Sequence, residues 1–337
     1  MKLRVALVGA TGLVGQECLK VLHQRNFPLA SLNLFASDRS TGRKVRFGDE
    51  ELPIQELAGD SFRHTDIAFF GAGADVSRHH IPLAVKAGAV CIDKSAIYRM
   101  EPGVPLVVPE VNGNDLAKHR GIIASPNCST IQFVMAIHPI HKFNPIKRAI
   151  VDTYQSVSGT GSAAMEELSA QTKLVMEGKG TVPHVYPHQI AFNVLPQVEV
   201  FMGNGYTTEE WKMVQETQKI LHDSKMSISS TCARVPVFIG HSEAAHLELT
   251  RPTTVEEVHR WLSEAPGVKV LDELNVNLYP HAWAAVGRDE VFVGRLRLDV
   301  SHPTGLAMWI VADNLRKGAA LNAVQIAEEL AARSLVG

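Results

Sequence analysis

Cys128 is the side chain whose type and position best suit nucleophilic chemistry. It lies in Ser-Pro-Asn-Cys-Ser-Thr at residues 125–130, directly before the apolar helical run 131–140. Asn127 is a favourable N-cap residue, so Cys128 is expected in the first turn of that helix. The field at a helix N-terminus lowers the pKa of a thiol and raises its thiolate population. The remaining cysteines lie in apolar patterns typical of buried structural thiols: Cys18, Cys91 and Cys232.

A glycine-rich turn at residues 9–15 is the second chemical feature. Gly-Ala-Thr-Gly-Leu-Val-Gly follows the strand pattern of residues 3–8 and opens the helical pattern of residues 14–23. The glycines permit a tight turn and close backbone approach, and the helix N-terminus offers free N–H groups to a pyrophosphate. A simple strand-to-helix turn also uses glycine, but this setting favours a dinucleotide. The predicted cofactor contacts here are Gly9, Thr11, Gly12, Leu13, Val14 and Gly15.

The choice between NAD and NADP depends on the segment after the second strand, residues 36–42. An acidic residue there holds a ribose 2′-hydroxyl, whereas an arginine receives a 2′-phosphate. The segment contains both types, because Asp38 stands beside Arg39. Ser37, Arg39, Ser40 and Thr41 together are expected to form a small anion-binding nest, so the sequence favours NADP and leaves NAD as the alternative.

A cysteine nucleophile beside a nicotinamide implies a particular reaction. The thiolate attacks a carbonyl carbon, a hydride passes to or from the adduct, and the N–H groups of the helix stabilise the developing oxyanion. A general acid/base is also required, and imidazole is the usual choice near neutral pH. The chain has 15 histidines, and their spacing alone does not select one.

The pattern of strands and helices predicts an α/β fold in two parts. Short apolar strand patterns at 3–8, 32–36, 67–70, 90–92 and 122–124 alternate with helical segments, which is typical of a doubly wound parallel sheet. Beyond that region, longer strand patterns surround helices and indicate a mixed sheet. These strands are expected at 149–157, 227–236, 245–249 and 291–298, and the helices at 162–177, 209–222 and 255–264. An amphipathic helix is expected at 318–333.

Composition excludes several classes of function. The formal net charge of −2 and the lack of a long basic run argue against a nucleic-acid or membrane-surface partner. No apolar stretch approaches the roughly 20 residues of a membrane span, and the first residues lack the pattern of a signal peptide. The scattered cysteines include no CxxC pair, so neither a metal site nor a disulfide framework is expected. We therefore expect a cytoplasmic protein with small-molecule substrates.

Several motifs, in order along the whole chain, resemble the aspartate-semialdehyde dehydrogenase family. They are the segments at 9–15, 125–130, Thr-Tyr-Gln-Ser-Val-Ser-Gly at 153–159, Ala-Phe-Asn-Val-Leu-Pro-Gln at 191–197, Arg-Val-Pro-Val-Phe-Ile-Gly-His-Ser-Glu at 234–243, Val-Gly-Arg at 293–295 and Ala-Asp-Asn-Leu-Arg-Lys-Gly-Ala-Ala at 312–320. The resemblance implies a Rossmann-type NADP-binding domain at 1–127, completed by a C-terminal helix at 314–337. It also implies an α+β catalytic and dimerisation domain at 128–313.

The resemblance assigns roles to individual residues. Cys128 becomes the acyl-thioester, and His241 is the acid/base. Gln155 orients the substrate, and Arg234 clamps its α-carboxylate, which suits a planar bidentate donor. Glu209 receives the substrate ammonium, although its spacing to Lys212 also suits a simple helical ion pair. The implied phosphate ligands are Arg99, Asn127 and Lys212, and the implied contacts at the nicotinamide end of the cofactor are Ser158, Gly159 and Asn314.

The implied reaction is the reversible, NADP-linked conversion of β-aspartyl phosphate to aspartate semialdehyde and phosphate, by a homodimer or homotetramer. This step feeds lysine (through diaminopimelate), threonine and methionine synthesis. The alternatives are an N-acetyl-γ-glutamyl-phosphate reductase and a non-catalytic dinucleotide-binding protein. One departure from the family stands out, since Lys94 occupies a position where asparagine is common.

Overall fold

The computed structural model describes residues 2–37 and 40–336, which form two compact units. The first unit contains Met1–Asn127 and Ala319–Gly337, and the second contains Cys128–Gly318. The C-terminal segment that completes the first unit thus begins at residue 319, whereas 314 was expected. Residues 313 and 314 stay with the second unit because their side chains accept main-chain N–H groups there, from Gly287 and Gly240.

A seven-stranded sheet forms the first unit, in the order β3-β4-β2-β1-β5-β6-β7. Its strands are β1 (Leu3–Val8), β2 (Leu29–Ala36), β3 (Lys44–Phe47), β4 (Glu50–Glu56), β5 (Ile67–Phe70), β6 (Val90–Asp93) and β7 (Ile122–Ala124). All neighbours are parallel except β3, which runs antiparallel to β4. Without β3, the strands follow the 3-2-1-4-5-6 order of a Rossmann sheet, which confirms the predicted fold class. The β3–β4 hairpin was not predicted, because its strands are charged and largely exposed.

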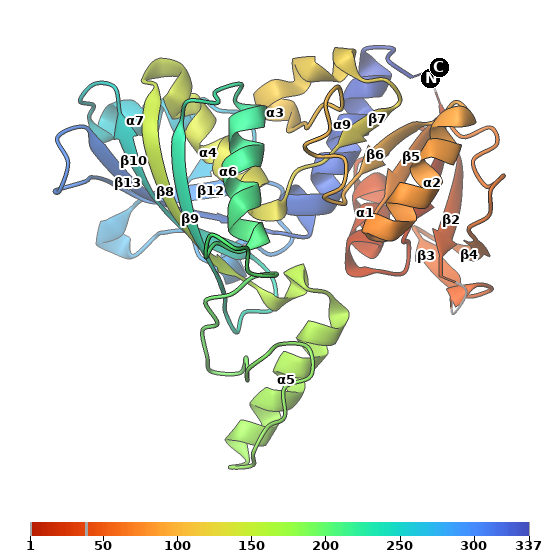
Figure 1. The fold of residues 1–337 in the computed structure, drawn as a ribbon, viewed down its shortest axis with the longest axis horizontal. Coiled ribbons are helices and arrows are strands. Elements are labelled where there is room, and N and C mark those ends of the chain that lie inside the picture. Colours follow the sequence, from red (N-terminus) through yellow and green to blue (C-terminus); the bar gives the residue numbers. More distant parts are fainter. Residues whose placement is uncertain (1, 38–39, 337) are drawn as a thin grey trace. The chain divides into compact units, whose positions relative to one another are not determined.

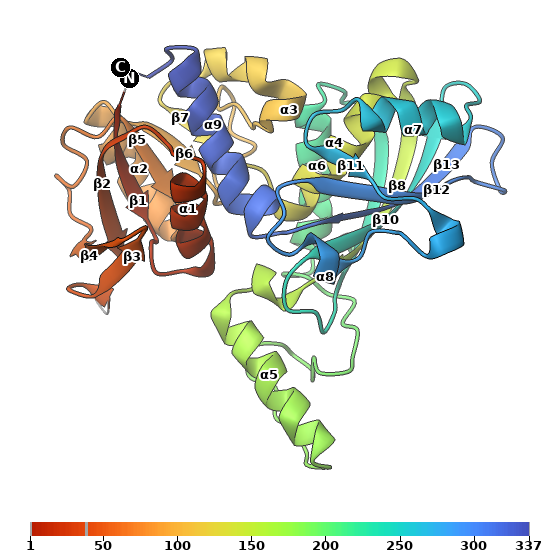
Figure 2. The same ribbon diagram turned by 180° about the vertical axis from the view of Figure 1, so that it is seen from behind.

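Helices cover both faces of this sheet (Figure 1, Figure 2). The helices of this unit are α1 (Leu13–Gln24), α2 (Ala74–Lys86), α3 (Pro109–Asn112) and α9 (Leu321–Ala332). Residues 3, 5 and 7 of β1 pack with α1 and α9, whereas residues 6 and 8 pack with α2, as alternation along a strand requires. The C-terminal helix α9 therefore belongs to the core of the first unit.

The second unit is built on a six-stranded mixed sheet in the order β11-β12-β13-β10-β8-β9. The strands are β8 (Ile146–Gln155), β9 (Ser227–Arg234), β10 (His241–Leu249), β11 (Val268–Val270), β12 (Val291–Leu298) and β13 (Gly305–Ala312). The helices α4 (Cys128–Phe143), α6 (Thr208–Ile220) and α7 (Val255–Ser263) pack against this sheet. Two further helices are α5 (Ser162–Met176), which projects away from the sheet in both views, and the short α8 (Ala282–Ala285).

Four expectations, for the strands of the second unit and for the C-terminal helix, need correction. β13 was not predicted, because it is buried along its length and lacks an alternating pattern. β10 begins at residue 241 and not at 245, and β8 ends at residue 155 and not at 157. The predicted helix at 318–333 is divided into a π-helical turn, Arg316–Ala320, and α9. In the described part of the chain, no helix is long and apolar enough to cross a membrane.

Candidate active site

The turn after β1 has the geometry of a phosphate cradle. Gly9 has a φ of +92°, and a Cβ there would lie 2.8 Å from the main chain of Gly71, which follows β5. A Cβ on Gly15 would lie 2.2 Å from the carbonyl oxygen of Gly9. Side chains are therefore excluded where the strand order reverses, which is where open α/β sheets bind nucleotides. Gly12 precedes the first helical residue and leaves the N–H groups of the first turn of α1 without a side-chain cap.

The predicted 2′-phosphate nest lies partly outside the described residues. Arg39 and Asp38 are not described, so the structure does not test them. The flanking residues form a turn in which the N–H of Ser40 donates to the carbonyl of Ser37 at 2.8 Å. Ser37 is exposed and Ser40 is buried.

Four strand ends meet at one edge of the second sheet and explain how distant residues come together. β8 ends at Gln155 and the parallel β9 ends at its register partner Arg234. The antiparallel β10 begins beside them at His241, whose register partner is Ala312 at the end of β13. Asn314 follows two residues after Ala312. Three of the predicted substrate and catalytic residues and one predicted cofactor contact thus share this edge.

Cys128 is the first residue of α4, as predicted, and Asn127 directly precedes it. The Cys128 side chain is partly exposed, whereas the other three cysteines are buried. Burial raises the pKa of the Cys18 thiol to about 12 and also raises the pKa values of Cys91 and Cys232. Cys128 is thus the one partly accessible thiol of this chain. A Cβ on Gly318 would lie 3.0 Å from Cβ of Cys128, so glycine at 318 leaves room for the thiol-bearing residue.

His241 is fully buried, and its ring is held from one side. The main-chain N–H of Ser156 donates to Nδ1 at 3.0 Å, and Oγ of Ser156 lies 3.0 Å from the same atom. Nε2 has no hydrogen-bond partner among the described residues. Burial, reinforced by the charge of Arg234, places the pKa of His241 well below its ordinary value. The resting ring is therefore neutral, with Nε2 available to a ligand.

Arg234 and His241 both approach residue 159 closely, which is possible because this residue is glycine. A Cβ on Gly159 would lie 2.9 Å from Nη1 of Arg234 and 3.3 Å from Nε2 of His241. Arg234 is 5% exposed, and its Nη1 donates to the carbonyl of Ser156 at 2.8 Å. Its buried Nε has no partner among the described residues. A guanidinium fixed in this way retains a donor for an anionic ligand.

Gln155, Glu209 and Lys212 form a polar chain from the sheet edge to α6. Nε2 of Gln155 donates to Oε1 of Glu209 at 3.1 Å and to Oγ of Ser129 at 2.9 Å. Lys212 Nζ lies 3.3 Å from Oε2 of Glu209 and also bonds Oε1 of Glu199. The helical ion pair anticipated from their spacing is thus present. It does not decide between a structural and a substrate-binding role for Glu209 and Lys212.

Two of the predicted nicotinamide contacts of the second unit, Ser158 and Asn314, belong to a buried network, whereas Gly159 is exposed. Oδ1 of Asn314 accepts from the N–H of Gly240 at 2.9 Å, from Oγ of Ser156 at 3.1 Å and from Oγ of Ser158 at 3.2 Å. Nδ2 of Asn314 donates to Oγ of Ser158 at 2.9 Å. Asn314 therefore holds the segments around residues 156–158 and 240 together, next to the His241 ring.

Arg99 lies in the first unit and is 7% exposed. Its Nε donates to the carbonyl of Ser125 at 3.1 Å, and its Nη2 donates to the carbonyl of Lys94 at 2.8 Å. These bonds attach Arg99 to the segment that leads to Asn127, which is buried. The structure does not test their predicted contacts with phosphate.

A second polar pair lies on the same elements as the nucleophile and the imidazole. Gln132 follows Cys128 by one helical turn, and its Nε2 donates to the carbonyl of His241 at 3.4 Å. Glu243 follows His241 by two residues on β10 and is fully buried. Neither carboxyl oxygen of Glu243 has a hydrogen-bond partner among the described residues, and Oε1 of Gln132 has none either. Burial raises the pKa of Glu243 well above its ordinary value.

Sequence reasoning missed Ser156, Ser129, Gln132 and Glu243. Ser156 lies inside the motif 153–159, and Glu243 ends the motif 234–243. The one available signal was their presence in these motifs, because their contacts join segments far apart in the chain. Among the described residues, no cluster of three or more His, Cys, Asp or Glu side chains is arranged to hold a metal.

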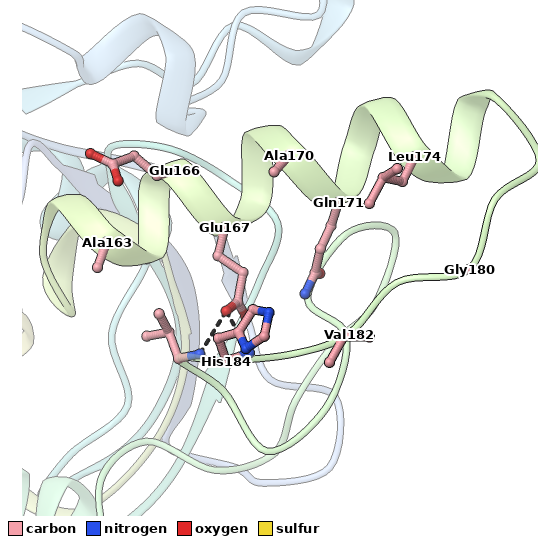
Figure 3. Close-up of a pocket in the computed structure, with 10 residues that line it drawn as sticks. Ala163, Glu166, Glu167, Ala170, Gln171, Leu174, Gly180, Val182 and His184 are labelled. Atoms are coloured by element: carbon pink, nitrogen blue, oxygen red, sulfur yellow. Dashed lines mark hydrogen bonds between the residues drawn. The ribbon is translucent and has the colours of Figure 1, made fainter.

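A separate groove of about 530 Å³ lies beneath α5 (Figure 3). Glu167 and Gln171 from the helix line it together with residues 180–185. Oε2 of Glu167 accepts the main-chain N–H groups of His184 and Val185 at 2.8 and 2.6 Å, which fixes the returning segment to α5. None of the predicted site residues lines this groove, so we do not assign it to the reaction.

Known proteins and protein families match this chain over nearly its whole length. Residues 4–119 match the family described as semialdehyde dehydrogenase, NAD binding domain, and residues 137–317 match semialdehyde dehydrogenase, dimerisation domain. The aspartate-semialdehyde dehydrogenase of Legionella pneumophila is 53% identical over 331 residues, covering 97% of this chain and 95% of that protein. Aspartate semialdehyde dehydrogenase II of Vibrio cholerae, complexed with ASA, has a TM-score of 0.96 and 45% identity, covering 98% of both chains. Aspartate semialdehyde dehydrogenase of Candida albicans with NADP has a TM-score of 0.76 and 26% identity, covering 99% of both chains.

Proposed function

Because this chain belongs to the aspartate-semialdehyde dehydrogenase family, we propose that Cys128, Gln155, Arg234 and His241 carry out the reaction of that family. The activity is the NADP-dependent, reversible conversion of β-aspartyl phosphate to aspartate semialdehyde, a step of amino-acid biosynthesis. The identity to the Legionella enzyme over nearly the full chain, together with the semialdehyde dehydrogenase domains, favours this substrate over that of an N-acetyl-γ-glutamyl-phosphate reductase.

The approach of Arg234 and His241 to Gly159 is the observation that carries the assignment of roles. Arg234 has a buried donor without a partner among the described residues, and Nε2 of His241 has none there either. A carboxylate is the natural ligand of Arg234, and the oxygen of a thiol adduct is the natural partner of His241. A molecule with an α-carboxylate and a reactive carbonyl supplies both groups.

In the biosynthetic direction, the Cys128 thiolate attacks the acyl carbon and inorganic phosphate leaves, which forms a thioester. NADPH, held by the glycine cradle at residues 9–15, would supply the hydride that reduces this carbon. His241 gives a proton to the resulting oxygen, and collapse of the hemithioacetal releases the aldehyde and the thiol. The N–H groups at the start of α4 stabilise the negative oxygen before it is protonated.

The remaining roles follow from the family resemblance and stay predictions. Gln155 orients the substrate beside Cys128, and Glu209 receives its ammonium group. Arg99, Asn127 and Lys212 bind phosphate, and Ser158, Gly159 and Asn314 line the nicotinamide end of the cofactor. The glycine cradle at residues 9–15 fits the pyrophosphate of NADP because no side chain occupies it.

Two properties of the assembled protein are also proposed. A homodimer or homotetramer accords with the dimerisation domain matched by residues 137–317. Sedimentation velocity distinguishes these assemblies from a monomer. A cytoplasmic location stays a prediction, which fractionation of the source cells tests.

The decisive assay follows NADPH formation from aspartate semialdehyde, NADP and phosphate. We expect turnover that requires all three reactants and that disappears in Cys128→Ser. Turnover with N-acetylglutamate semialdehyde but none with aspartate semialdehyde would assign the chain to the alternative substrate. The Cys128→Ser variant, assayed alongside, controls for contaminating dehydrogenases.

A further inference from the structure

Ser156 provides both neighbours of Nδ1 in the His241 ring. Its main-chain N–H lies 3.0 Å from Nδ1, and so does its hydroxyl oxygen. A main-chain N–H only donates, so it requires a lone pair on Nδ1. In the neutral ring the single proton is therefore on Nε2, the nitrogen next to Gly159.

This tautomer limits what the ring does in its resting state. A neutral imidazole with its proton on Nε2 donates a hydrogen bond to an oxygen of a bound ligand. It takes up a proton at Nδ1, on the side turned toward Ser156. When this charged ring gives its Nε2 proton to the substrate, the second proton remains on Nδ1. Proton transfer at Nε2 thus requires an acceptor for Nδ1–H, which a main-chain N–H cannot be.

The hydroxyl of Ser156 is suited to be that acceptor. When Nδ1 carries a proton, Oγ of Ser156 turns a lone pair to Nδ1 and donates its own hydrogen to Oδ1 of Asn314 at 3.1 Å. Oγ of Ser158 lies at the same distance of 3.1 Å and is a second partner for this hydrogen. Asn314 is in turn fixed by the N–H of Gly240 at 2.9 Å. Both Ser156 and Asn314 are buried, so water does not readily replace the hydroxyl.

The charged surroundings make this acceptor important. The Arg234 guanidinium on β9 opposes a positive ring, and burial does so as well. On α4, Gln132 is uncharged and donates to the main-chain oxygen of His241, while Cys128 stands at the start of the same helix. Burial raises the pKa of Glu243, on the same strand as His241, well above its ordinary value. A main-chain hydrogen bond with Gly240 favours the charged ring, but less than burial and Arg234 oppose it. The Ser156 hydroxyl is the side-chain acceptor that the contacts place at Nδ1.

We propose that Ser156 is a positioning residue that controls which nitrogen of His241 carries the proton. The main-chain N–H of Ser156 holds the resting ring as the Nε2–H tautomer. The hydroxyl of Ser156 accepts a hydrogen bond from Nδ1–H in the charged ring, and continues to do so after Nε2 has given up its proton. The proposal rests on the proposed acid/base role of His241 and adds a residue through which that role is performed.

The kinetic test compares Ser156→Ala, Ser156→Thr and Ser242→Ala. Ser242 is a matched control because it adjoins His241 in sequence and lines a pocket with Ala244, two residues along the same strand. We expect Ser156→Ala to lower kcat by about 10- to 100-fold, as for loss of a hydrogen bond to a charged group, and to change KM for the semialdehyde less than about threefold. In the pH profile of kcat, the apparent pKa assigned to His241 should shift to lower pH. Ser156→Thr should restore most of kcat, and Ser242→Ala should behave as the wild type.

Wild-type kcat and an unchanged pH profile in Ser156→Ala would overturn the proposal. Equal losses in the alanine and threonine variants, with both folded by circular dichroism, would overturn it too, because packing and not the hydroxyl would be responsible.

The second measurement does not depend on turnover. In protein labelled with ¹⁵N-histidine, the signal of His241 is identified by its absence in His241→Asn. We expect Nε2 to carry the proton in the wild type and also in Ser156→Ala, which retains the main-chain N–H. A proton on Nδ1 in the resting wild type would refute the proposal. Full activity of His241→Asn would instead refute the proposed role of His241, and the position of the proton would still be known.

Discussion

Gly159 packs against the guanidinium of Arg234 so closely that a Cβ at Gly159 would lie 2.9 Å from Nη1 of Arg234. We predict that Gly159→Ala displaces Arg234 and the His241 ring, and that kcat/KM falls by roughly 100-fold, as for a misplacement near 1 Å. Steady-state kinetics measure this effect. Gly203→Ala is the control, because a Cβ at Gly203 meets nothing within 4 Å. Full activity of Gly159→Ala would show that the positions of Arg234 and His241 beside Gly159 are not needed for the reaction.

Cys128 is expected to be the only thiol that forms the covalent adduct. Cys128→Ser should reduce turnover by at least about 1,000-fold and leave NADP affinity unchanged, because an alkoxide is inaccessible at neutral pH. Mass spectrometry of the enzyme with semialdehyde and NADP, but without phosphate, should place the added mass on Cys128. An adduct on buried Cys18, Cys91 or Cys232 would contradict the assignment.

The positive side chains should divide into two groups by the substrate that they bind. Arg234→Lys keeps the charge but loses the planar fork, so KM for the semialdehyde should rise roughly tenfold and kcat should fall. Arg99→Ala and Lys212→Ala should instead raise KM for phosphate. Steady-state constants with each substrate varied in turn provide the test. The reverse pattern, with phosphate KM raised in Arg234→Lys alone, would show that the map of the pocket is wrong.

Cofactor choice is predicted to depend on Arg39, which lies outside the described residues. If Arg39 binds the 2′-phosphate, Arg39→Ala should weaken NADP binding by about 10-fold or more and leave NAD binding nearly unchanged. Dissociation constants from fluorescence titration with both cofactors measure this difference. Equal weakening of both cofactors would remove Arg39 from the 2′-phosphate site.

Local patterns predicted the features that local geometry determines. The tight turn at Gly9 and Gly15 needs glycine for reasons within a few residues of the chain, apart from the packing of Gly9 against Gly71. The helix that begins at Cys128 is likewise signalled by Asn127 and the apolar run after it. The parallel strands were visible as short buried runs, whereas the polar β3–β4 hairpin was not.

Features that depend on sheet topology escaped the sequence patterns. His241 could not be selected from 15 histidines by spacing, because its position depends on β10 starting beside the ends of β8 and β9. The family resemblance identified it instead. Ser156 had no signal of its own, since a serine at the end of a strand is ordinary until the His241 ring is placed against it. Residue spacing carries little information about such contacts between distant segments.

The buried acid Glu243 should make stability depend on pH in a direction opposite to that of most carboxylates. Its pKa in the folded protein is raised well above its ordinary value of 4.5. The folded state therefore binds more protons than the unfolded state above pH 4.5, and stability is lost as pH rises from 4.5 toward the folded pKa. The loss is roughly 1.4 kcal/mol for each pH unit within that window.

Glu243→Gln has nearly the same shape as the neutral acid and does not ionise, so it should remove this loss. We predict a variant that is about as stable as the wild type near pH 4.5 and more stable than the wild type by roughly 1–3 kcal/mol at about pH 7. Urea unfolding at several pH values between about 5 and 8 measures the difference. Glu248→Gln is the control, because Glu248 lies on the same strand but is partly exposed and paired with Arg148. A difference between Glu243→Gln and the wild type that did not grow with pH would mean that Glu243 is ionised in the folded protein. A negative charge would then lie near His241, and the resting ring could no longer be taken as neutral.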